Sequence, residues 1–308
     1  LEAFDVLDEP QVRHNESVLE IDDPILGRHE QVAPPIRFAS SSSNVPNPAP
    51  QPANSADLPS WLEPPAFRQN QGLPLKEECA PLAGIRVLDL GAFFAVPFGS
   101  RLLAELGADV IRLETPAGDP NRGLEVIFRA SHACKRSIGV DLKHPDSHKV
   151  KEQLLSWADA ISHSMRPGVA ERLGVGYEQA KAINPDVVYA YGPGWGSSGP
   201  DSQSQSFAPL MSGYVGIAFE VAGQFNQPVY PTGNEDPGNG MLGALGILMG
   251  LIQRRKTGEG QYLEHPQLSA ALSHMSHIVR LESGETLGAM RVDPLQLGIG
   301  PMDRLYQT

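Results

Sequence analysis

Cysteine is scarce in this sequence, and long apolar runs are missing. The 308 residues include only Cys79 and Cys134, too few for a disulfide framework, and such low usage is typical of a reducing compartment. The longest nearly uninterrupted apolar run, Met241–Ile252, has twelve residues, whereas about 20 are needed to span a bilayer. We therefore expect a cytoplasmic protein with no membrane-spanning helix and no membrane partner.

Basic residues are also in short supply. Lys and Arg number 24 against 36 Asp and Glu, a formal net charge of −12 that argues against nucleic acid as a partner. The exception is the segment 129–151, where six basic residues face two acidic ones. Such a local excess can hold an anionic ligand, although a solvated helix face would show the same pattern. The six basic residues are Arg129, Lys135, Arg136, Lys143, Lys149 and Lys151.

The first 80 residues divide into a hairpin and a proline-rich stretch. Two short runs within residues 17–32 flank a turn that contains Pro24 and Gly27, which predicts a β-hairpin. Seven prolines follow between Pro46 and Pro65. Because proline has no N–H to donate, this stretch can form neither a helix nor a central strand. We expect an extended linker over residues 40–80.

From residue 82 onward, short apolar runs alternate with segments of helical periodicity. The pattern predicts strands at 85–90, 110–114, 136–142, 160–164 and 187–192 and around Tyr262. It predicts helices at 97–106, 145–157, 169–173, 177–183 and 237–255 and from Pro266 towards Arg280. Strands separated by such helices form parallel sheets that are covered on both faces. The predicted fold class is α/β, a Rossmann-like parallel sheet with flanking helices.

Two kinds of functional motif are present only in part. Residues 194–199 match G-x-G-x-x-G after a predicted strand, but Pro200 and a polar stretch follow where a dinucleotide site needs a helix. We therefore do not expect an NAD site, and no G-x-S-x-G stretch supports serine hydrolase chemistry. Two histidine pairs at helical spacing lack a third ligand, so we expect no metal site. These pairs are His144/His148 and His274/His277.

Asp236 is the residue whose surroundings best suit catalysis. It precedes Pro237 and a segment, 237–255, that is apolar on nearly every side and is predicted to form a buried helix. Asp before proline at the first helical position is a common N-cap. The same carboxylate, among glycines that let a substrate approach, also suits nucleophilic attack. The residues alone leave both interpretations open.

Four stretches of the sequence carry a family resemblance. They are PLAGIRVLDLGAFFAVPFGSRLLAELGADVIRLETPAGDPNRG, CKRSIGVDLKHPD, RPGVAERLGVGYEQAKAINPDVVYAYGPGWGSSGP and GMLGALGILMGLIQRRKTGEGQYLE. Through them, residues 81–280 resemble the large domain of the family III CoA-transferases (CaiB/BaiF type). This group contains formyl-CoA transferase, carnitine CoA-transferase and α-methylacyl-CoA racemase. The stretches occur in the family's order and span about two-thirds of the chain.

The resemblance implies a reaction and a set of site residues. The reaction is transfer of coenzyme A between an acyl-CoA thioester and a carboxylic acid, both of them substrates, with no permanently bound cofactor. Asp236 falls on the position of the family's nucleophile, which forms an aspartyl anhydride and then an aspartyl-CoA thioester. Matching positions imply CoA contacts at Phe94, Ala95, Val140, Lys143 and Arg172. Ser164 and Met165 stand at a further CoA contact, where the family usually has Asn-Phe.

Departures from the family pattern keep two alternatives open. Ser164 and Met165 suggest a non-catalytic CoA-binding repeat of a tandem enzyme. The racemase is the other alternative, but Ser204 and Gln205 occupy the positions of that branch's His-Asp pair. Racemisation at the α-carbon would then lack one of its two bases. Among the three functions, CoA transfer is the best supported by the residues.

Both ends of the chain differ from those of one complete family member. Residues 1–39 resemble the C-terminal tail of a preceding CoA-transferase-like domain, and 40–80 form the linker. Residues 81–285 form the large domain, and 286–308 begin the connection to a small domain that is largely absent. We therefore expect a fragment of a tandem protein. The resemblance further implies an interlocked homodimer or an intramolecular tandem pair.

Overall fold

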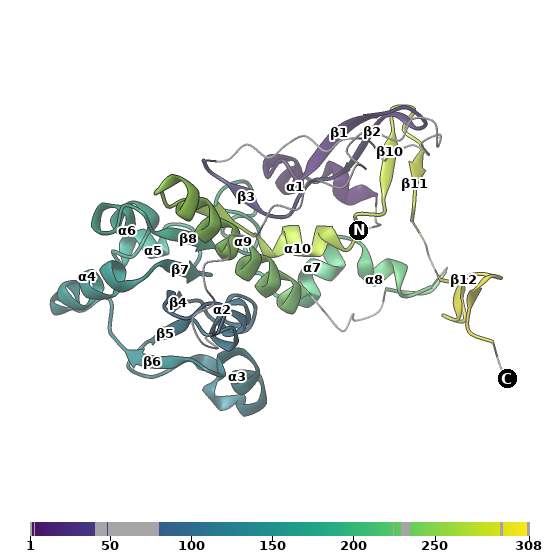
Figure 1. The fold of residues 1–308 in the computed structure, drawn as a ribbon. Helices are drawn as coiled ribbons and strands as arrows, with labels where there is room; N and C mark the ends of the chain where they lie inside the picture. Colours follow the sequence, from purple (N-terminus) through teal and green to yellow (C-terminus); the bar gives the residue numbers. More distant parts are fainter. Residues whose placement is uncertain are drawn as a thin grey trace.

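A seven-stranded sheet forms the centre of the protein (Figure 1). The computed structural model describes residues 2, 4–40, 48, 80–223, 225–228, 235–289 and 292–306, so the expected linker lies almost wholly outside the described residues. The strands are β3 (Arg37–Phe38), β4 (Arg86–Leu90), β5 (Asp109–Glu114), β6 (Arg136–Gly139), β7 (Ala160–His163), β8 (Val188–Tyr191) and β9 (Tyr262–Glu264). Their order is β3-β9-β8-β7-β4-β5-β6.

The strand directions confirm the predicted Rossmann-like fold. Strands β4 to β9 are mutually parallel, and only β3 is antiparallel, at the edge beside β9. The chain runs from β4 outwards through β5 and β6, and then returns to β7 on the other side of β4. Because a parallel sheet of this kind has helices on both faces, its central strands read as continuous apolar runs.

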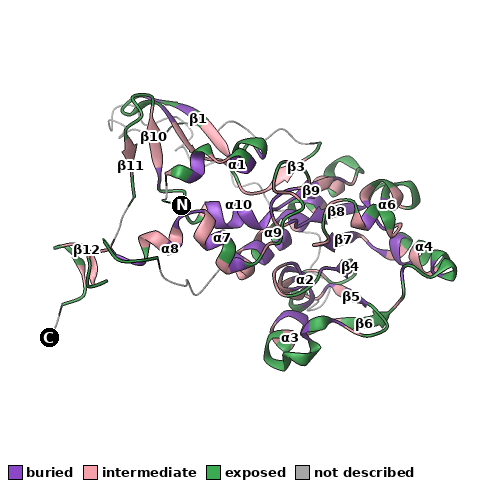
Figure 2. Ribbon diagram, turned by 180° about the vertical axis from the view of Figure 1, so that it is seen from behind, coloured by how far each residue is buried: buried purple, intermediate pink, exposed green. Residues whose placement is uncertain are grey.

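Helices cover both faces of the sheet. The helices from β4 onwards are α2 (Ala95–Glu105), α3 (Glu125–His132), α4 (His148–Trp157), α5 (Val169–Arg172), α6 (Tyr177–Ile183), α7 (Ala208–Tyr214), α8 (Ile217–Glu220), α9 (Glu235–Thr257) and α10 (Gln267–Ser273). One core joins Val87 to α2 and α9, and a second joins Leu88 to α4 and α6. A third core joins α7 and α10 to residues 6–12. Figure 2 shows the buried central strands in purple and the exposed outer turns of α4 and α6 in green. Alternate residues of β4 thus serve opposite faces.

Helix α9 lies close against the sheet because glycines line its inner side. A Cβ atom at Gly246 would lie 2.8 Å from Leu263, and one at Gly250 would lie 2.6 Å from Val188. Glycine at these two positions allows the close approach, but the predicted burial of the whole helix is wrong. Four apolar residues on one side of α9 are between 44% and 56% exposed. They are Met241, Leu245, Met249 and Ile252.

A smaller antiparallel sheet combines the two ends of the described chain. It has the order β1 (Val18–Asp23), β2 (Gly27–Val32), β10 (Val279–Leu281) and β11 (Thr286–Leu287). The predicted hairpin is confirmed, since Val18 pairs with Val32. The predicted helix towards Arg280 is wrong: α10 ends at Ser273, and Arg280 pairs with Glu30 of β2. Pairing with β2 satisfies backbone groups that a longer helix would have satisfied within itself.

Short elements complete the described chain. They are α1 (Pro10–His14), the 3-10 turns at Asp5–Asp8, Pro120–Gly123 and Pro145–Ser147, and the strands β12 (Gly298–Gly300) and β13 (Asp303–Arg304). Helix α1 supports the loop after β8: Gln11 Nε2 donates to the carbonyl of Ser198 at 2.9 Å, and the Gln11 side-chain oxygen accepts from the Asp201 N–H. Among the described helices, none combines the length and apolarity needed to cross a bilayer.

Candidate active site

A cavity of about 380 Å³ lies at the carboxyl edge of the sheet. It opens at the topological switch point of the sheet, between the parallel strands β4 and β7, where the chain begins to add strands on the other side of β4. The loops after these two strands diverge there and leave a crevice. Its walls come from residues 92–96 after β4, 164–167 after β7 and 192–194 after β8. Residues 202 and 204–207 and the first turns of α9 and α10 close the remaining sides.

Asp236 lines this cavity from the first turn of α9. The N-cap interpretation is wrong, because α9 already begins at Glu235. The Asp236 carboxylate instead accepts a hydrogen bond at Oδ1 from Gln267 Nε2. Burial raises the pKa of Asp236, the hydrogen bond from Gln267 lowers it, and the charge of Glu235 raises it. A carboxylate that is partly stripped of water in a cleft has the properties of a functional group.

Gln267 and Ser206 belong to the same site. The Ser206 hydroxyl donates to Gln267 Oε1, and both residues line the cavity. The loop after β8 allows this contact, because a Cβ atom at Gly194 would lie 2.2 Å from that of Ser206. Gly194 therefore makes room for a side chain of the site, which its place in the partial G-x-G-x-x-G pattern did not reveal. Neither Gln267 nor Ser206 was predicted from the sequence.

Asn239 lies one turn after Asp236 and also faces the cavity. Its side chain is held from behind, since His265 Nδ1 lies 2.8 Å from Asn239 Oδ1. Burial lowers the pKa of His265 to about 4, so this imidazole is neutral at pH 7. His163, in β7, is stacked on Tyr191 and buried, which lowers its pKa to about 3. Each histidine thus contacts a residue of the cavity lining, His265 through Asn239 and His163 by accepting from the Met165 N–H at 3.3 Å.

Four of the predicted CoA contacts line the cavity. Phe94 and Ala95 come from the loop after β4, and Ser164 and Met165 come from the loop after β7. The Ser164 hydroxyl accepts a hydrogen bond from the Ala92 N–H at 2.8 Å and so ties the two loops together. Serine at this position therefore has a defined structural role.

The other three predicted contacts do not line the cavity. Val140 is half-buried against the core, and Lys143 and Arg172 are exposed. All three follow the carboxyl ends of strands, β6 for Val140 and Lys143 and β7 for Arg172. Since parallel strands end at one edge of the sheet, these residues and the cavity share that edge.

The basic segment 129–151 is less positive than its composition suggests. Arg136 pairs with Asp109 at 2.6 Å, and Arg129 pairs with Glu125. The Lys135 ammonium is 1% exposed and pairs with Asp89 at 2.7 Å. Lys143 and Lys149 are exposed, and no ion pair of either is found within the described part of the chain. Lys151 also has no ion pair in that part of the chain, since its ammonium donates to the carbonyls of Leu142 and Leu173. The local field therefore depends mainly on these three lysines.

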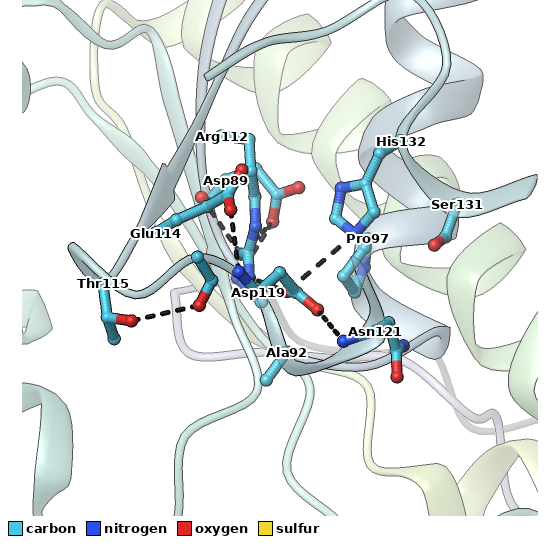
Figure 3. A network of polar contacts seen from close by, with 12 residues as sticks. Asp89, Ala92, Pro97, Arg112, Glu114, Thr115, Asp119, Asn121, Ser131 and His132 are labelled. Atoms are coloured by element: carbon cyan, nitrogen blue, oxygen red, sulfur yellow. Dashed lines mark hydrogen bonds and ion pairs between the residues drawn. The ribbon is translucent and has the colours of Figure 1, made fainter. Parts of the chain in front are cut away.

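Asp89 is the centre of a buried charged network behind the cavity (Figure 3). Its carboxylate accepts from the Gly91 N–H at 2.9 Å, and Lys135 donates both to it and to the Pro97 carbonyl. Burial opposes the charge of Asp89, but Lys135 and Arg112 hold its pKa well below the usual range. Arg112 also reaches Asp119 at 2.6 Å. The network fixes both ends of the loop 92–96.

The described residues contain no group of three or more His, Cys, Asp or Glu side chains that could hold a metal ion. A carboxylate does lie beside one histidine of each pair. His277 Nε2 is 3.5 Å from Glu220 Oε2, and His144 Nδ1 is 3.8 Å from Asp146 Oδ2. Neither contact indicates a metal site or a catalytic site.

The chain is similar to known CoA-transferases. The profile of CoA-transferase family III matches residues 82–308. The beta subunit of succinyl-CoA–L-malate CoA-transferase from Chloroflexus aurantiacus is 34% identical over 195 residues, which are 60% of this chain and 48% of that protein. Succinyl-CoA:glutarate CoA-transferase from Homo sapiens is 33% identical over 208 residues, 64% of this chain and 48% of that protein. The chain spans about half the length of the curated relatives it matches.

Solved structures show the same fold. A hypothetical protein from Mycobacterium tuberculosis has a TM-score of 0.61 at 26% identity, over 64% of this chain and 57% of that one. A CaiB/BaiF family protein from Brucella suis has a TM-score of 0.59 at 26% identity, over 64% of this chain and 55% of that one. With the matched profile, the parallel sheet and the cavity at its switch point taken together, the chain belongs to CoA-transferase family III.

Proposed function

We propose that the protein transfers coenzyme A between an acyl-CoA thioester and a carboxylic acid. The observation that carries the proposal is the Asp236 carboxylate, which is partly desolvated and lines the cavity at the switch point of the sheet. Relatives named for transfer from succinyl-CoA to malate or glutarate support a carboxylic acid as acceptor. Asp236 also stands where the family resemblance puts the nucleophile.

The proposed reaction uses the Asp236 carboxylate as a covalent carrier. One carboxylate oxygen attacks the thioester carbonyl, the C–S bond breaks, and CoA thiolate leaves an aspartyl mixed anhydride. The thiolate then attacks the aspartyl carbonyl, which releases the donor acid and leaves an aspartyl-CoA thioester. The acceptor carboxylate displaces the thiolate to form a second anhydride. Attack of the thiolate on the acceptor carbonyl gives the new acyl-CoA and restores Asp236.

We further propose that the seven matched positions bind CoA along the carboxyl edge of the sheet. Phe94, Ala95, Ser164 and Met165 would contact the thioester end, because they line the cavity with Asp236. The remaining three positions lie outside the cavity on the same edge and would contact the distant part of CoA. They are Val140, Lys143 and Arg172.

Lys143→Glu is expected to weaken CoA binding about tenfold at low salt, because it reverses a charge next to the CoA phosphates. The remaining binding should depend less on salt. Lys256→Glu is the matched control, since Lys256 is also exposed and lies in the last turn of α9, outside the basic segment. Calorimetric titration of both variants with CoA checks the expectation. Equal affinity of the two variants and the unmodified protein would remove Lys143 from the site.

The racemase alternative has less support. No histidine is among the residues that line the cavity in the described part of the chain, and Ser204 and Gln205 occupy its wall. Racemisation needs a base on each face of the α-carbon, and neither Ser204 nor Gln205 is one. The non-catalytic alternative, a repeat that binds CoA without transferring it, predicts binding with no turnover.

A label-transfer assay separates these functions. The protein is incubated with succinyl-CoA and carbon-13-labelled malate or glutarate, and acyl-CoA products are identified by mass spectrometry. CoA transfer predicts labelled malyl-CoA or glutaryl-CoA together with free succinate. Binding of CoA with no labelled product in either reaction would favour the non-catalytic repeat.

We propose that residues 1–39 are the tail of a preceding domain and that 81–285 form the large domain, as an interlocked homodimer or an intramolecular tandem pair. The pairing of β2 with β10 and of β3 with β9 joins residues 27–38 to the sheets of residues 81–285.

A further inference from the structure

Gln267 is held more firmly than an ordinary surface glutamine. It begins α10 and is 7% exposed. Its backbone N–H donates to the Pro193 carbonyl at 2.8 Å, and the next N–H, of Leu268, donates to the Gly194 carbonyl at 3.0 Å. These two bonds fix the start of α10 on the loop after β8, and so they fix the point from which the Gln267 side chain extends.

The orientation of the Gln267 amide follows from its two partners. Its Nε2 group faces Asp236 Oδ1, and its Oε1 atom faces the Ser206 hydroxyl. The reversed amide would bring Oε1 against a carboxylate oxygen, where two acceptors repel each other. Ser206 can donate to Oε1 and so stabilises the orientation that presents N–H groups to Asp236. The order of donation is therefore Ser206 to Gln267 to Asp236.

We infer that Gln267, oriented by Ser206, keeps one oxygen of the Asp236 carboxylate, Oδ1, as a bound spectator and leaves Oδ2 as the attacking oxygen. The inference rests on the proposed function. No hydrogen bond to Oδ2 is found among the described residues, although Asp236 lines the cavity. The backbone under Asp236 is also fixed, because Gly240 of α9 packs closely against Ala95 and Gly99.

The same contact acts in the second chemical step. When Oδ2 has formed the anhydride, Oδ1 is the carbonyl oxygen on the aspartyl side of that anhydride. Attack of CoA thiolate on this carbonyl moves negative charge onto Oδ1, where the Gln267 N–H already points. A preplaced donor at a developing oxyanion lowers the barrier of such a step. Gln267 thus orients the carboxylate first and stabilises the oxyanion afterwards.

The inference predicts which oxygen atoms of Asp236 exchange with substrate. In each cycle the attacking oxygen leaves with the donor acid, and an oxygen of the acceptor carboxylate replaces it. If Oδ1 is always the spectator, repeated turnover with oxygen-18-labelled acid introduces one heavy oxygen into Asp236. If the carboxylate can rotate, both oxygens become heavy.

The test uses succinyl-CoA and succinate that carries oxygen-18 in both carboxylates. After many turnovers, the peptide that contains residue 236 is analysed by mass spectrometry. We expect one heavy oxygen in the unmodified protein, two in Gln267→Leu, and a mixture in Ser206→Ala, which leaves the glutamine in place without its anchor. Gln153→Leu, an exposed residue of α4, is the control and should match the unmodified protein. A merely structural role for Gln267 would slow turnover without changing the oxygen count.

The outcomes separate this inference from the proposed function. Two heavy oxygens in the unmodified protein, or one in Gln267→Leu, would overturn the inference while supporting the covalent reaction. No heavy oxygen at residue 236 in the unmodified protein would count against the proposed function. The contact is then tested without turnover, by carbon-13 NMR titration of the Asp236 carboxyl group.

In that titration, the midpoint of the Asp236 carboxyl group should lie about one pH unit higher in Gln267→Leu than in the unmodified protein. The reason is that a hydrogen bond to the charged form is lost. The Asp236 signal is assigned through its disappearance in Asp236→Asn. An unchanged midpoint would overturn the contact between the two side chains.

Discussion

The Asp236→Asn variant is expected to lose CoA transfer by at least about 1,000-fold while it keeps its fold. An amide cannot attack a thioester, and the variant differs from the natural residue by one atom at the same place. Steady-state assay of acyl-CoA formation measures the loss. Affinity for CoA should change little, because the proposed CoA contacts are other residues of the carboxyl edge.

The same variant is expected to be at least as stable as the unmodified protein at neutral pH. Burial raises the pKa of Asp236, so the folded protein binds its proton more tightly than the unfolded chain does. The cost of ionisation in the folded state therefore grows as the pH rises from the ordinary Asp value of about 4 through the raised pKa. Urea denaturation at pH 3 and pH 8 should show a larger gain in unfolding free energy of Asp236→Asn at pH 8.

Two companion variants separate chemistry from structure. Asp146→Asn changes an exposed carboxylate and should leave activity and stability unchanged. Asp236→Ser retains a polar group at the start of α9 but should not form the anhydride, so its activity should be as low as that of the Asn variant. Near-normal turnover in either Asp236 variant would show that another group is the nucleophile.

The Lys135→Met variant is expected to lose about 3 to 5 kcal/mol of unfolding free energy, because it leaves a buried carboxylate short of its partner. The Lys135 ammonium and the Asp89 carboxylate are 1% and 0% exposed, and their atoms are 2.7 Å apart. Methionine fills a similar volume, so the loss reports on charge rather than on a cavity. Urea denaturation at pH 7 measures it.

The pH dependence of this loss has a defined direction. The pKa of Asp89 lies well below its ordinary value, so the pair contributes fully above about pH 4 and less as the pH falls through the lowered pKa. The difference between Lys135→Met and the unmodified protein should therefore narrow in acid. Arg129→Met, which breaks the exposed pair with Glu125, is the control and should cost less than about 1 kcal/mol. Equal losses in the two variants would contradict the buried network.

The central sheet could be predicted because each strand is coded locally. The segment 188–191 is a short run without charged residues between helical patterns, and so is 160–163, and the structure buries every residue of both strands. The small sheet could not be predicted in full, because Val279–Leu281 becomes a strand only where β2 supplies its partner. That pairing joins residues about 250 positions apart, and no periodicity in either segment indicates it.

The residues of the candidate site also divide into those that the sequence could reveal and those that it could not. Asp236 could be found from the glycines and the helix that follow it, and the family resemblance gave it a role. Gln267 and Ser206 are 61 residues apart in sequence, and each is unremarkable in its own segment. Lys135 was predicted as part of a positive surface, but it is buried because Asp89, 46 residues earlier, receives its charge. Neither residue spacing nor composition indicates which distant residues pair in this way.

Chemical trapping at Asp236 tests the proposed function most directly. The protein is incubated with succinyl-CoA and then with hydroxylamine, which converts an aspartyl anhydride or thioester to a hydroxamate, and the modified residue is located by peptide mass spectrometry. We expect a hydroxamate at Asp236 that requires succinyl-CoA and is absent in Asp236→Asn. Transfer of CoA with no modification of Asp236, or with the hydroxamate on Glu235 instead, would contradict the account.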